Sequence, residues 1–255
     1  MIETKSISCG YTEKNILADL DLKISQDEFA VLIGPNGAGK STLLYCLMGF
    51  LPLRGGSISI KEKKLGSYRR LDLARIMAYV PQETGFLFDY PVQEVILMGR
   101  YPWLKFLQTW SAEDKEIVAR VMTQLGLDEF KERWFSQLSG GEKQRVLLAR
   151  ALVQDTDFIF LDETLSQLDI NHQIETMQLL RDIRDKHHKG IFLISHNLNL
   201  AANYADRIIF LKAGRIIAEG HPDSLIEPSI MKEVFSVELQ TQRNPVSGRM
   251  NIIYP

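Results

Sequence analysis

Phe29-Ala-Val-Leu-Ile33 runs directly into Gly34-Pro-Asn-Gly-Ala-Gly39-Lys40-Ser41-Thr42, and this stretch decides the fold. The first five residues are all apolar, as in a buried strand. The remainder fits the phosphate-binding pattern G-x-x-x-x-G-K-[ST], which needs a strand before it and a helix after it. Its glycines permit a tight turn in which several backbone N–H groups point at phosphate oxygens. The stretch therefore predicts a strand, a phosphate loop and a helix that together bind a nucleoside triphosphate.

Each residue type in this loop has its own task. Lys40 brings a positive charge to the β and γ phosphates, and Ser41 offers a hydroxyl to Mg²⁺. The helix that begins here directs the positive end of its dipole at the same anion. A glycine-rich turn with an incidental lysine is the alternative, but it does not explain the complete pattern after a strand. The predicted phosphate-binding residues are Gly34, Pro35, Asn36, Gly37, Ala38, Gly39, Lys40, Ser41 and Thr42.

The composition excludes several classes of protein. A chain of 255 residues can form one sizeable core, and its net charge of −2 lacks the basic surplus typical of nucleic-acid binding. No apolar run of about 18 residues is present, so we expect no membrane span, and the N-terminus lacks the layout of a signal peptide. Cys9 and Cys46 are too few for a disulfide framework and predict buried thiols in a reducing cytosol.

The apolar pattern predicts an α/β fold with a helical insert. Alternating or continuous apolar residues predict strands at 20–24, 57–60, 76–80, 158–161 and 191–194, and a hairpin at 208–218. Helical periodicity predicts helices at 112–125, capped by Ser111, and at 170–186 and 198–204. Buried strands separated by helices imply a mainly parallel sheet.

We therefore expect a single domain over 1–255 with a phosphate-loop nucleotide-binding core. The core is predicted at 1–83 and 155–255, with an antiparallel β portion at its N-terminal end. Residues 84–154, which have almost no strand pattern, are predicted to form an inserted α-helical subdomain.

Two carboxylates end one of the predicted core strands, Phe158-Ile-Phe-Leu-Asp162-Glu163. The carboxyl end of a strand is where ligands lie in open α/β sheets. Asp162 would hold Mg²⁺, and Glu163 would orient or deprotonate an attacking water. Alone this pattern is weak, because many strands end in acidic loops. Beside a phosphate loop it indicates hydrolysis of the bound nucleotide.

A second candidate anion site lies at Leu138-Ser139-Gly140-Gly141-Glu142, before the apolar helix 146–152. Ser139 is a good N-cap, and the glycines expose backbone N–H groups at the positive end of the helix. An ordinary capped helix would have the same features. Two such helix starts in one chain nevertheless suggest that a γ-phosphate is bound from two sides.

The order of these motifs resembles that of ABC-transporter ATPases over essentially the whole chain. Leu-Ser-Gly-Gly-Glu is similar to the signature of that family, which contacts ATP in trans. The resemblance implies that Tyr11 stacks on adenine, that Gln82 senses Mg²⁺ and water, and that His196 contacts the γ-phosphate. It also implies that Ser166-Gln-Leu-Asp169 couples two active sites across a dimer through Asp169. Taken singly, the tyrosine, glutamine and histidine could equally be core or surface residues.

The chain departs from the family at Thr164, where a proline usually follows the catalytic glutamate. Threonine frees φ and restores an N–H donor. Because Glu163 itself is present, we expect hydrolysis to be retained.

The resemblance implies a mechanism and a set of partners. Two identical subunits enclose two ATP molecules with Mg²⁺; the catalytic residues are Glu163, His196, Lys40 and Gln82, and the metal is held near Ser41, Gln82 and Asp162. Separate membrane permease subunits would contact the Gln82 loop and the helical subdomain at the cytoplasmic face of the membrane. A periplasmic or surface substrate-binding protein would complete the system, and no nucleic acid is expected.

Less specific sequence patterns indicate which branch of the ABC ATPases the chain resembles. The stretches 95–102, 168–173 and 245–249 are similar to ATPases of importers for iron-siderophores, haem and cobalamin. Molybdate importers share much of this pattern, and a soluble ABC ATPase of the iron–sulfur assembly type is a further alternative. The single cassette and the lack of a heptad run argue against translation factors and repair ATPases. A non-hydrolysing subunit would not need the intact catalytic set, and a GTPase or small-molecule kinase would not need Ser139 or His196.

Overall fold

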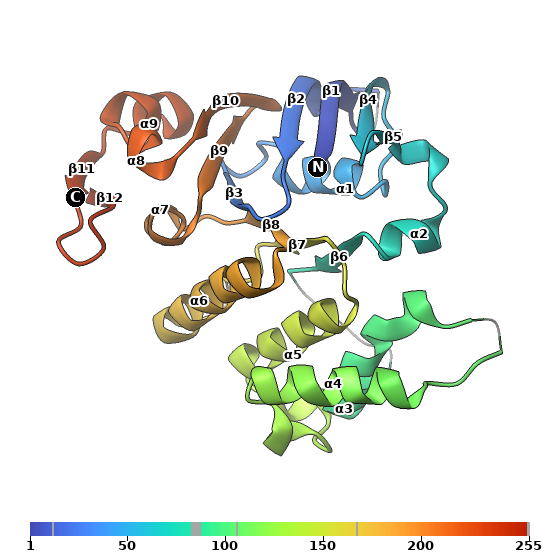
Figure 1. Cartoon of the computed structure of the whole chain (residues 1–255). Coiled ribbons are helices and arrows are strands. Elements are labelled where there is room, and N and C mark those ends of the chain that lie inside the picture. The colour runs from blue at the N-terminus through green and yellow to red at the C-terminus, as the bar shows by residue number, and fades with distance from the viewer. Residues whose placement is uncertain (12, 83–87, 106, 167, 254–255) are drawn as a thin grey trace.

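The computed structural model describes residues 1–11, 13–82, 88–105, 107–166 and 168–253. Its centre is a six-stranded sheet in the order β10-β9-β3-β8-β7-β6 (Figure 1). Neighbouring strands are parallel except β9 and β10, which form the predicted antiparallel hairpin. The strands are β3 (Phe29–Ile33), β6 (Met77–Val80), β7 (Phe158–Asp162), β8 (Gly190–Ile194), β9 (Arg207–Lys212) and β10 (Arg215–Gly220). The mainly parallel sheet expected from the sequence is confirmed.

The central strands are apolar throughout because both faces of the sheet are covered. Successive side chains of a strand point to opposite faces. Phe29 and Val31 join one hydrophobic cluster, while Ala30 and Leu32, which alternate with them, join another. Burial on both faces explains why β3, β7 and β8 are continuous apolar runs rather than alternating ones.

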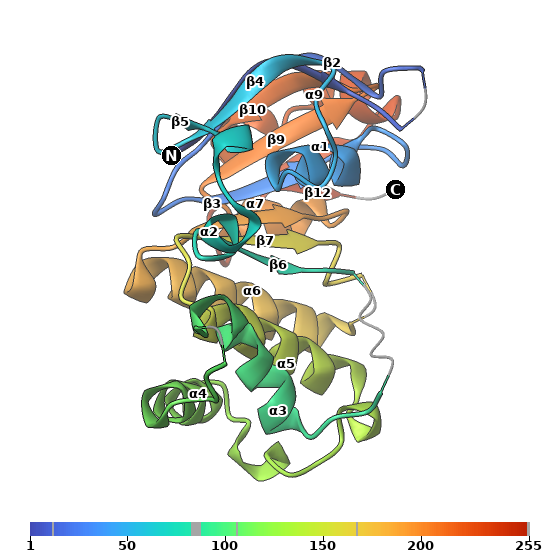
Figure 2. The same cartoon turned by 90° about the vertical axis from the view of Figure 1, so that its right-hand side faces the viewer.

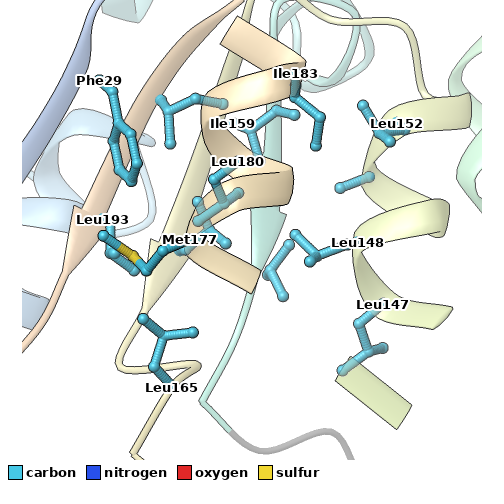
Figure 3. Close-up of a cluster of buried hydrophobic side chains, with 14 of the residues drawn as sticks. Phe29, Leu147, Leu148, Leu152, Ile159, Leu165, Met177, Leu180, Ile183 and Leu193 are labelled. Atoms are coloured by element: carbon cyan, nitrogen blue, oxygen red, sulfur yellow. The ribbon is translucent and has the colours of Figure 1, made fainter. Parts of the chain in front are cut away.

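Helices α5 (Gly140–Val153) and α6 (Ile170–His187) contribute to the first cluster (Figure 3). Leu180 and Ile183 of α6 share this cluster with Ile159 of β7, and α6 lies between the sheet residue Phe29 and Leu148 of α5 (Figure 3). All five side chains are fully buried. Burying a leucine or isoleucine contributes about 1.5–3 kcal/mol, so this cluster holds α6 against the sheet.

The second cluster lies between the central sheet, helix α1 (Lys40–Leu47) and a separate antiparallel sheet. That sheet has the order β2-β1-β4-β5. Its strands are β1 (Ile2–Cys9), β2 (Leu17–Ile24), β4 (Gly55–Ile60) and β5 (Lys63–Lys64). The expected N-terminal antiparallel portion is therefore present, with β1 as a strand that the apolar pattern did not predict.

The segment predicted to be helical contains three α-helices among its described residues, and these gather on one side of the central sheet (Figure 1). They are α3 (Val92–Leu97), α4 (Ala112–Gln124) and α5. Ser111 caps α4 in a reciprocal box: its Oγ accepts the Asp114 N–H at 3.1 Å, and Asp114 accepts the Ser111 N–H at 3.1 Å. The predicted boundary between 83 and 84 lies among residues 83–87, outside the described residues, so the division into core and helical subdomain stays a prediction.

The remaining elements are short. They are α2 (Arg70–Ala74), α7 (Leu198–Tyr204), α8 (Pro222–Leu225), α9 (Pro228–Phe235), the hairpin of β11 (Gln240–Arg243) and β12 (Met250–Ile253), and the 3₁₀ turns η1 (Leu65–Ser67), η2 (Met98–Trp103), η3 (Asp128–Phe130) and η4 (Phe135–Gln137). Within the described residues, no helix combines the length and the apolar character that crossing a bilayer requires.

Candidate functional site

The predicted phosphate loop connects β3 to α1, and its backbone requires glycine at Gly39. Gly39 has φ of 103°, in the left-handed region, and a Cβ there would lie 2.8 Å from Leu17 Cδ2. Helix α1 begins at the next residue, Lys40, so its first N–H groups are free to bind an anion at the loop. The strand, loop and helix predicted from the pattern are all present.

Lys40 is buried within this loop, with 5% of its surface exposed. Its Nζ donates to the carbonyl oxygens of Gly34 at 3.0 Å and Pro35 at 3.3 Å, and lies 3.7 Å from Glu163 Oε1. Burial lowers the pKa of Lys40, and the nearby Glu163 carboxylate opposes that shift. The loop therefore holds a desolvated cation beside the carboxylate that follows β7.

Ser41 and Asp162 bring two oxygen donors together. Ser41 Oγ donates to Asp162 Oδ1 at 3.2 Å, and Asp162 is 5% exposed at the end of β7. Burial raises the pKa of Asp162, although the Ser41 hydrogen bond partly offsets the shift. Hydroxyl and carboxylate oxygens are ligands that Mg²⁺ prefers, and a cation would compensate the buried charge. The donor set therefore fits Mg²⁺.

Glu163 is the centre of the predicted catalytic group. Its Oε1 lies 2.6 Å from His196 Nε2, and its Oε2 accepts a hydrogen bond from Gln82 Nε2 at 3.4 Å. Its φ of 48° places the side chain on a left-handed turn directly after the strand. Gln82 and His196, which are far apart in sequence, thus contact the two oxygens of one carboxylate.

The sheet order explains this convergence. The phosphate loop follows β3, His196 follows β8, Glu163 follows β7 and Gln82 follows β6, and these four strands are consecutive neighbours in the sheet. They are also parallel, so their carboxyl ends lie at one edge. The order of the strands could not be predicted from the sequence pattern, and it is the fold that brings these residues together.

The predicted signature loop lies at the start of α5. Ser139 Oγ accepts the Glu142 N–H at 3.4 Å, and Glu142 accepts the Ser139 N–H at 2.7 Å, which lowers the pKa of Glu142. Leu138 is buried and anchors the loop, while Gly140 is open to solvent. These local bonds give the capped helix expected from the sequence.

The signature loop packs against the start of α6 within the same chain. A Cβ on Gly141 would lie 2.6 Å from the His172 ring, which would then have to move aside. Asp169 caps α6 by accepting the His172 N–H at 3.0 Å, and this bond lowers the pKa of Asp169. In the segment 166–169, Gln167 lies outside the described residues. Among the described residues, the side-chain hydrogen bonds of Ser139 and Asp169 stay local and do not reach the phosphate loop.

Tyr11 lies on the loop after β1 and is 58% exposed. The same loop ends at Ile16, whose side chain lies 3.2 Å from the Cβ position of Gly39. Tyr11 is therefore an exposed aromatic ring on a loop that packs beside the phosphate loop. Its adenine role stays a prediction.

Thr164, the departure from the family pattern, is 4% exposed. Within the described part of the chain its hydroxyl has no hydrogen-bond partner. Leaving a hydroxyl buried and unpaired costs about 1–3 kcal/mol.

A group of asparagines that no sequence pattern predicts lies beside this site. A cavity of about 670 Å³ extends from Glu163 and His196 to the C-terminal hairpin. Its asparagines are Asn197, Asn199, Asn203, Asn244 and Asn251. None of these five asparagines is itself part of a sequence motif, so only the fold brings them together.

This chain is similar to known proteins in both sequence and fold. Residues 17–166 match the family described as ABC transporter. A petrobactin import ATP-binding protein of Bacillus anthracis is 37% identical over 247 residues, covering 97% of this chain and 90% of the relative. A hemin import ATP-binding protein of Rhodococcus jostii is 37% identical over 233 residues, covering 91% of this chain and 79% of the relative. The dimeric ATP-binding cassette MJ0796, solved in a post-hydrolysis state with ADP and Pi, has a TM-score of 0.75 and 26% identity, covering 87% of this chain and 99% of that one.

Proposed function

The chain belongs to the ABC transporter family, and we propose that it is the ATP-hydrolysing subunit of an importer for a metal chelate. The observation that carries this function is the convergence of four strand ends on Glu163, whose carboxylate contacts Lys40, His196 and Gln82. Hemin is an iron chelate, and this named cargo of a relative supports the class of substrate. An iron-siderophore, haem or cobalamin is the cargo we propose.

Phosphate binding, Mg²⁺ binding and activation of the water would be carried out by different residues. The loop N–H groups and Lys40 would bind the phosphates, while Ser41 and Asp162 would hold Mg²⁺. When bound, Mg²⁺ neutralises charge on the phosphate oxygens. Glu163 would orient the attacking water and accept its proton, because its two oxygens are already directed by His196 and Gln82.

A second copy would complete the site. The positive end of α5 and the Ser139 loop lie outside the hydrogen-bond network of the phosphate loop among the described residues. We therefore assign Leu138, Ser139, Gly140, Gly141 and Glu142 to the ATP of the partner subunit, with Asp169 coupling the two sites. The dimeric cassette among the structural relatives supports this assembly.

We place the docking surface for a membrane permease at the exposed apolar side chains of Phe50, Leu71 and Trp103. Leu71 belongs to α2, which lies on the side of the molecule that faces the viewer in Figure 2. The Phe50 ring lies 6.1 Å from Tyr79 on β6, three residues before Gln82, and the Arg75 guanidinium lies 5.1 Å from the Trp103 ring. Phe50 is 54% exposed, and clustered exposed aromatic side chains are typical of protein contacts.

The permease would hold the chain at the cytoplasmic face of the membrane, and a periplasmic or surface substrate-binding protein would deliver the cargo. The experiment is a pull-down with tagged Glu163→Gln protein and ATP from solubilised membranes of the native source. Recovery of a multi-spanning membrane protein would support an importer subunit. That recovery should be lost when Phe50→Asp is added to the tagged protein and kept when Val246→Asp is added. Val246 is 95% exposed in the C-terminal hairpin and is the matched control. Recovery of soluble partners alone would support the iron–sulfur assembly type instead.

A further inference from the structure

We propose that the C-terminal hairpin, β11–β12, is a positioning element for His196 and that Asn199 transmits its effect. This inference rests on the proposed role of His196 in ATP hydrolysis. The hairpin forms a two-stranded sheet of its own, apart from the other two sheets. An isolated two-stranded hairpin is marginally stable in water, so its order depends on what it packs against. Here it packs against α7 (Figure 1).

The side chain of Asn199 on α7 forms hydrogen bonds with the hairpin backbone, as a neighbouring strand would. Its Nδ2 donates to the Ile252 carbonyl at 3.0 Å, and its Oδ1 accepts the Ile252 N–H at 2.8 Å. Ile252 is 3% exposed, and its side chain belongs to the first hydrophobic cluster. One side chain thus satisfies both backbone groups of a buried residue, which fixes the hairpin relative to the helix.

The next turn of α7 repeats the contact. Asn203 Nδ2 donates to Asn251 Oδ1 at 3.3 Å, and Asn203 Oδ1 accepts from Ser247 Oγ. Asn244 Nδ2 also donates to Asn251 Oδ1, at 2.8 Å. Residues four apart lie on one face of a helix, so Asn199 and Asn203 form a continuous polar contact with the hairpin.

The amino-terminal end of the same helix carries the predicted switch residue. Asn197 caps α7 by accepting the Leu200 N–H at 3.0 Å, and His196 immediately precedes that cap. Asn197 Nδ2 also reaches Gln173 Oε1 at 3.4 Å, while Gln173 Nε2 donates to the Leu165 carbonyl at 3.1 Å. The placement of α7 therefore affects both His196 and Leu165, which lies two residues after Glu163.

A displacement of α7 would lengthen the 2.6 Å contact between His196 Nε2 and Glu163 Oε1. Small displacements of catalytic groups have large effects on rate, because the reacting groups must be held close to productive geometry. The phosphate loop has no hydrogen bond to the hairpin among the described residues. Loss of the hairpin contact should therefore lower kcat and leave the KM for ATP within about twofold.

The test compares Asn199→Ala with Asn199→Asp, which keeps the acceptor for the Ile252 N–H and loses the donor. We expect kcat to fall about tenfold in Asn199→Ala, which corresponds to about 1.4 kcal/mol, and to fall in Asn199→Asp as well, because a carboxylate oxygen would then face the Ile252 carbonyl oxygen. Val246→Ala, at the exposed tip of the hairpin, is the matched control and should retain the kcat of the unaltered chain. If Asn199→Ala does not fold, Asn199→Asp alone must still lower kcat without a matching rise in KM.

A double-mutant cycle separates positioning from a general loss of structure. In single-turnover assays with excess protein, Asn199→Ala should slow hydrolysis by less than about twofold when His196→Ala is already present. An undiminished tenfold effect in that background, or an unchanged kcat in Asn199→Ala, would overturn the inference. Glu163→Gln is run in parallel: if that variant keeps full turnover, the proposed function fails, independently of the result for Asn199.

Discussion

Replacing Thr164 with valine should stabilise the protein. Valine has nearly the shape of threonine but lacks the hydroxyl, which is buried at 4% exposure without a partner among the described residues. A buried unpaired polar group costs about 1–3 kcal/mol, so Thr164→Val should gain an amount in that range. For a chain of this size each 1 kcal/mol corresponds to about 2–4 °C in Tm. The expected result is therefore a rise of several degrees.

Differential scanning calorimetry on the nucleotide-free protein measures this change. Thr164→Ser is the matched control: it keeps the unpaired hydroxyl, removes a buried methyl group and should lower Tm. ATP turnover should be retained in both variants, and Thr164→Pro should alter turnover by less than about tenfold, because Glu163 is intact in each. A Thr164→Val variant with unchanged or lower Tm would refute the reasoning, since it would mean that the hydroxyl has a stabilising partner.

Three further predictions concern charge and thiol groups. Burial raises the pKa of Asp162, so the folded state binds the proton of this carboxyl more tightly than the unfolded chain does. The contribution of Asp162 to the free energy of unfolding therefore falls as the pH rises through the pKa of the folded state. Asp162→Asn should therefore raise Tm near neutral pH and flatten the pH dependence while weakening Mg²⁺-dependent turnover; a lower Tm would contradict this. Arg100 and Asp114 form a buried ion pair at 2.8 Å, and Arg100→Ala should cost roughly 3–5 kcal/mol by calorimetry, whereas a change below about 1 kcal/mol would contradict the pairing. Burial raises the pKa of both Cys9 and Cys46, whose sulfur atoms lie 2.6 Å apart, so mass spectrometry should detect alkylation only after denaturation; rapid labelling of the native protein would count against it.

Elements with a strong local pattern could be predicted from the sequence. The strand 29–33, the loop after it and the Ser111 cap agree with the structure because each depends on neighbouring residues alone. The hairpin of β9 and β10 was predicted for the same reason, since Ala213 and Gly214 supply its turn in left-handed conformations.

Elements that depend on distant contacts could not be predicted. β1 has register shifts between Thr4 and Ile7, and Ser6 has a φ of 46°, so its apolar residues do not alternate regularly. β11 reads Gln-Thr-Gln-Arg and has no apolar face of its own. The hairpin forms where Asn199 pairs with Ile252, and no local pattern encodes that pairing.

In the candidate site too, local motifs were predictable and distant contacts were not. The motifs identified Lys40, Glu163 and His196, but their mutual contacts come from the order of β3, β8 and β7 in the sheet. Strand order is a property of the whole chain. For that reason the individual residues were predictable and the 2.6 Å contact between His196 and Glu163 was not.

The central claim is that two copies of this chain enclose ATP and that Glu163 drives its hydrolysis. Multi-angle light scattering of the Glu163→Gln protein, with Mg²⁺ and either ATP or ADP, tests the first part, and phosphate release from the same samples tests the second. The account predicts a dimer in ATP, a monomer in ADP and turnover reduced at least about a hundredfold relative to the unaltered chain. A monomer in ATP, or turnover close to that of the unaltered chain, would contradict it.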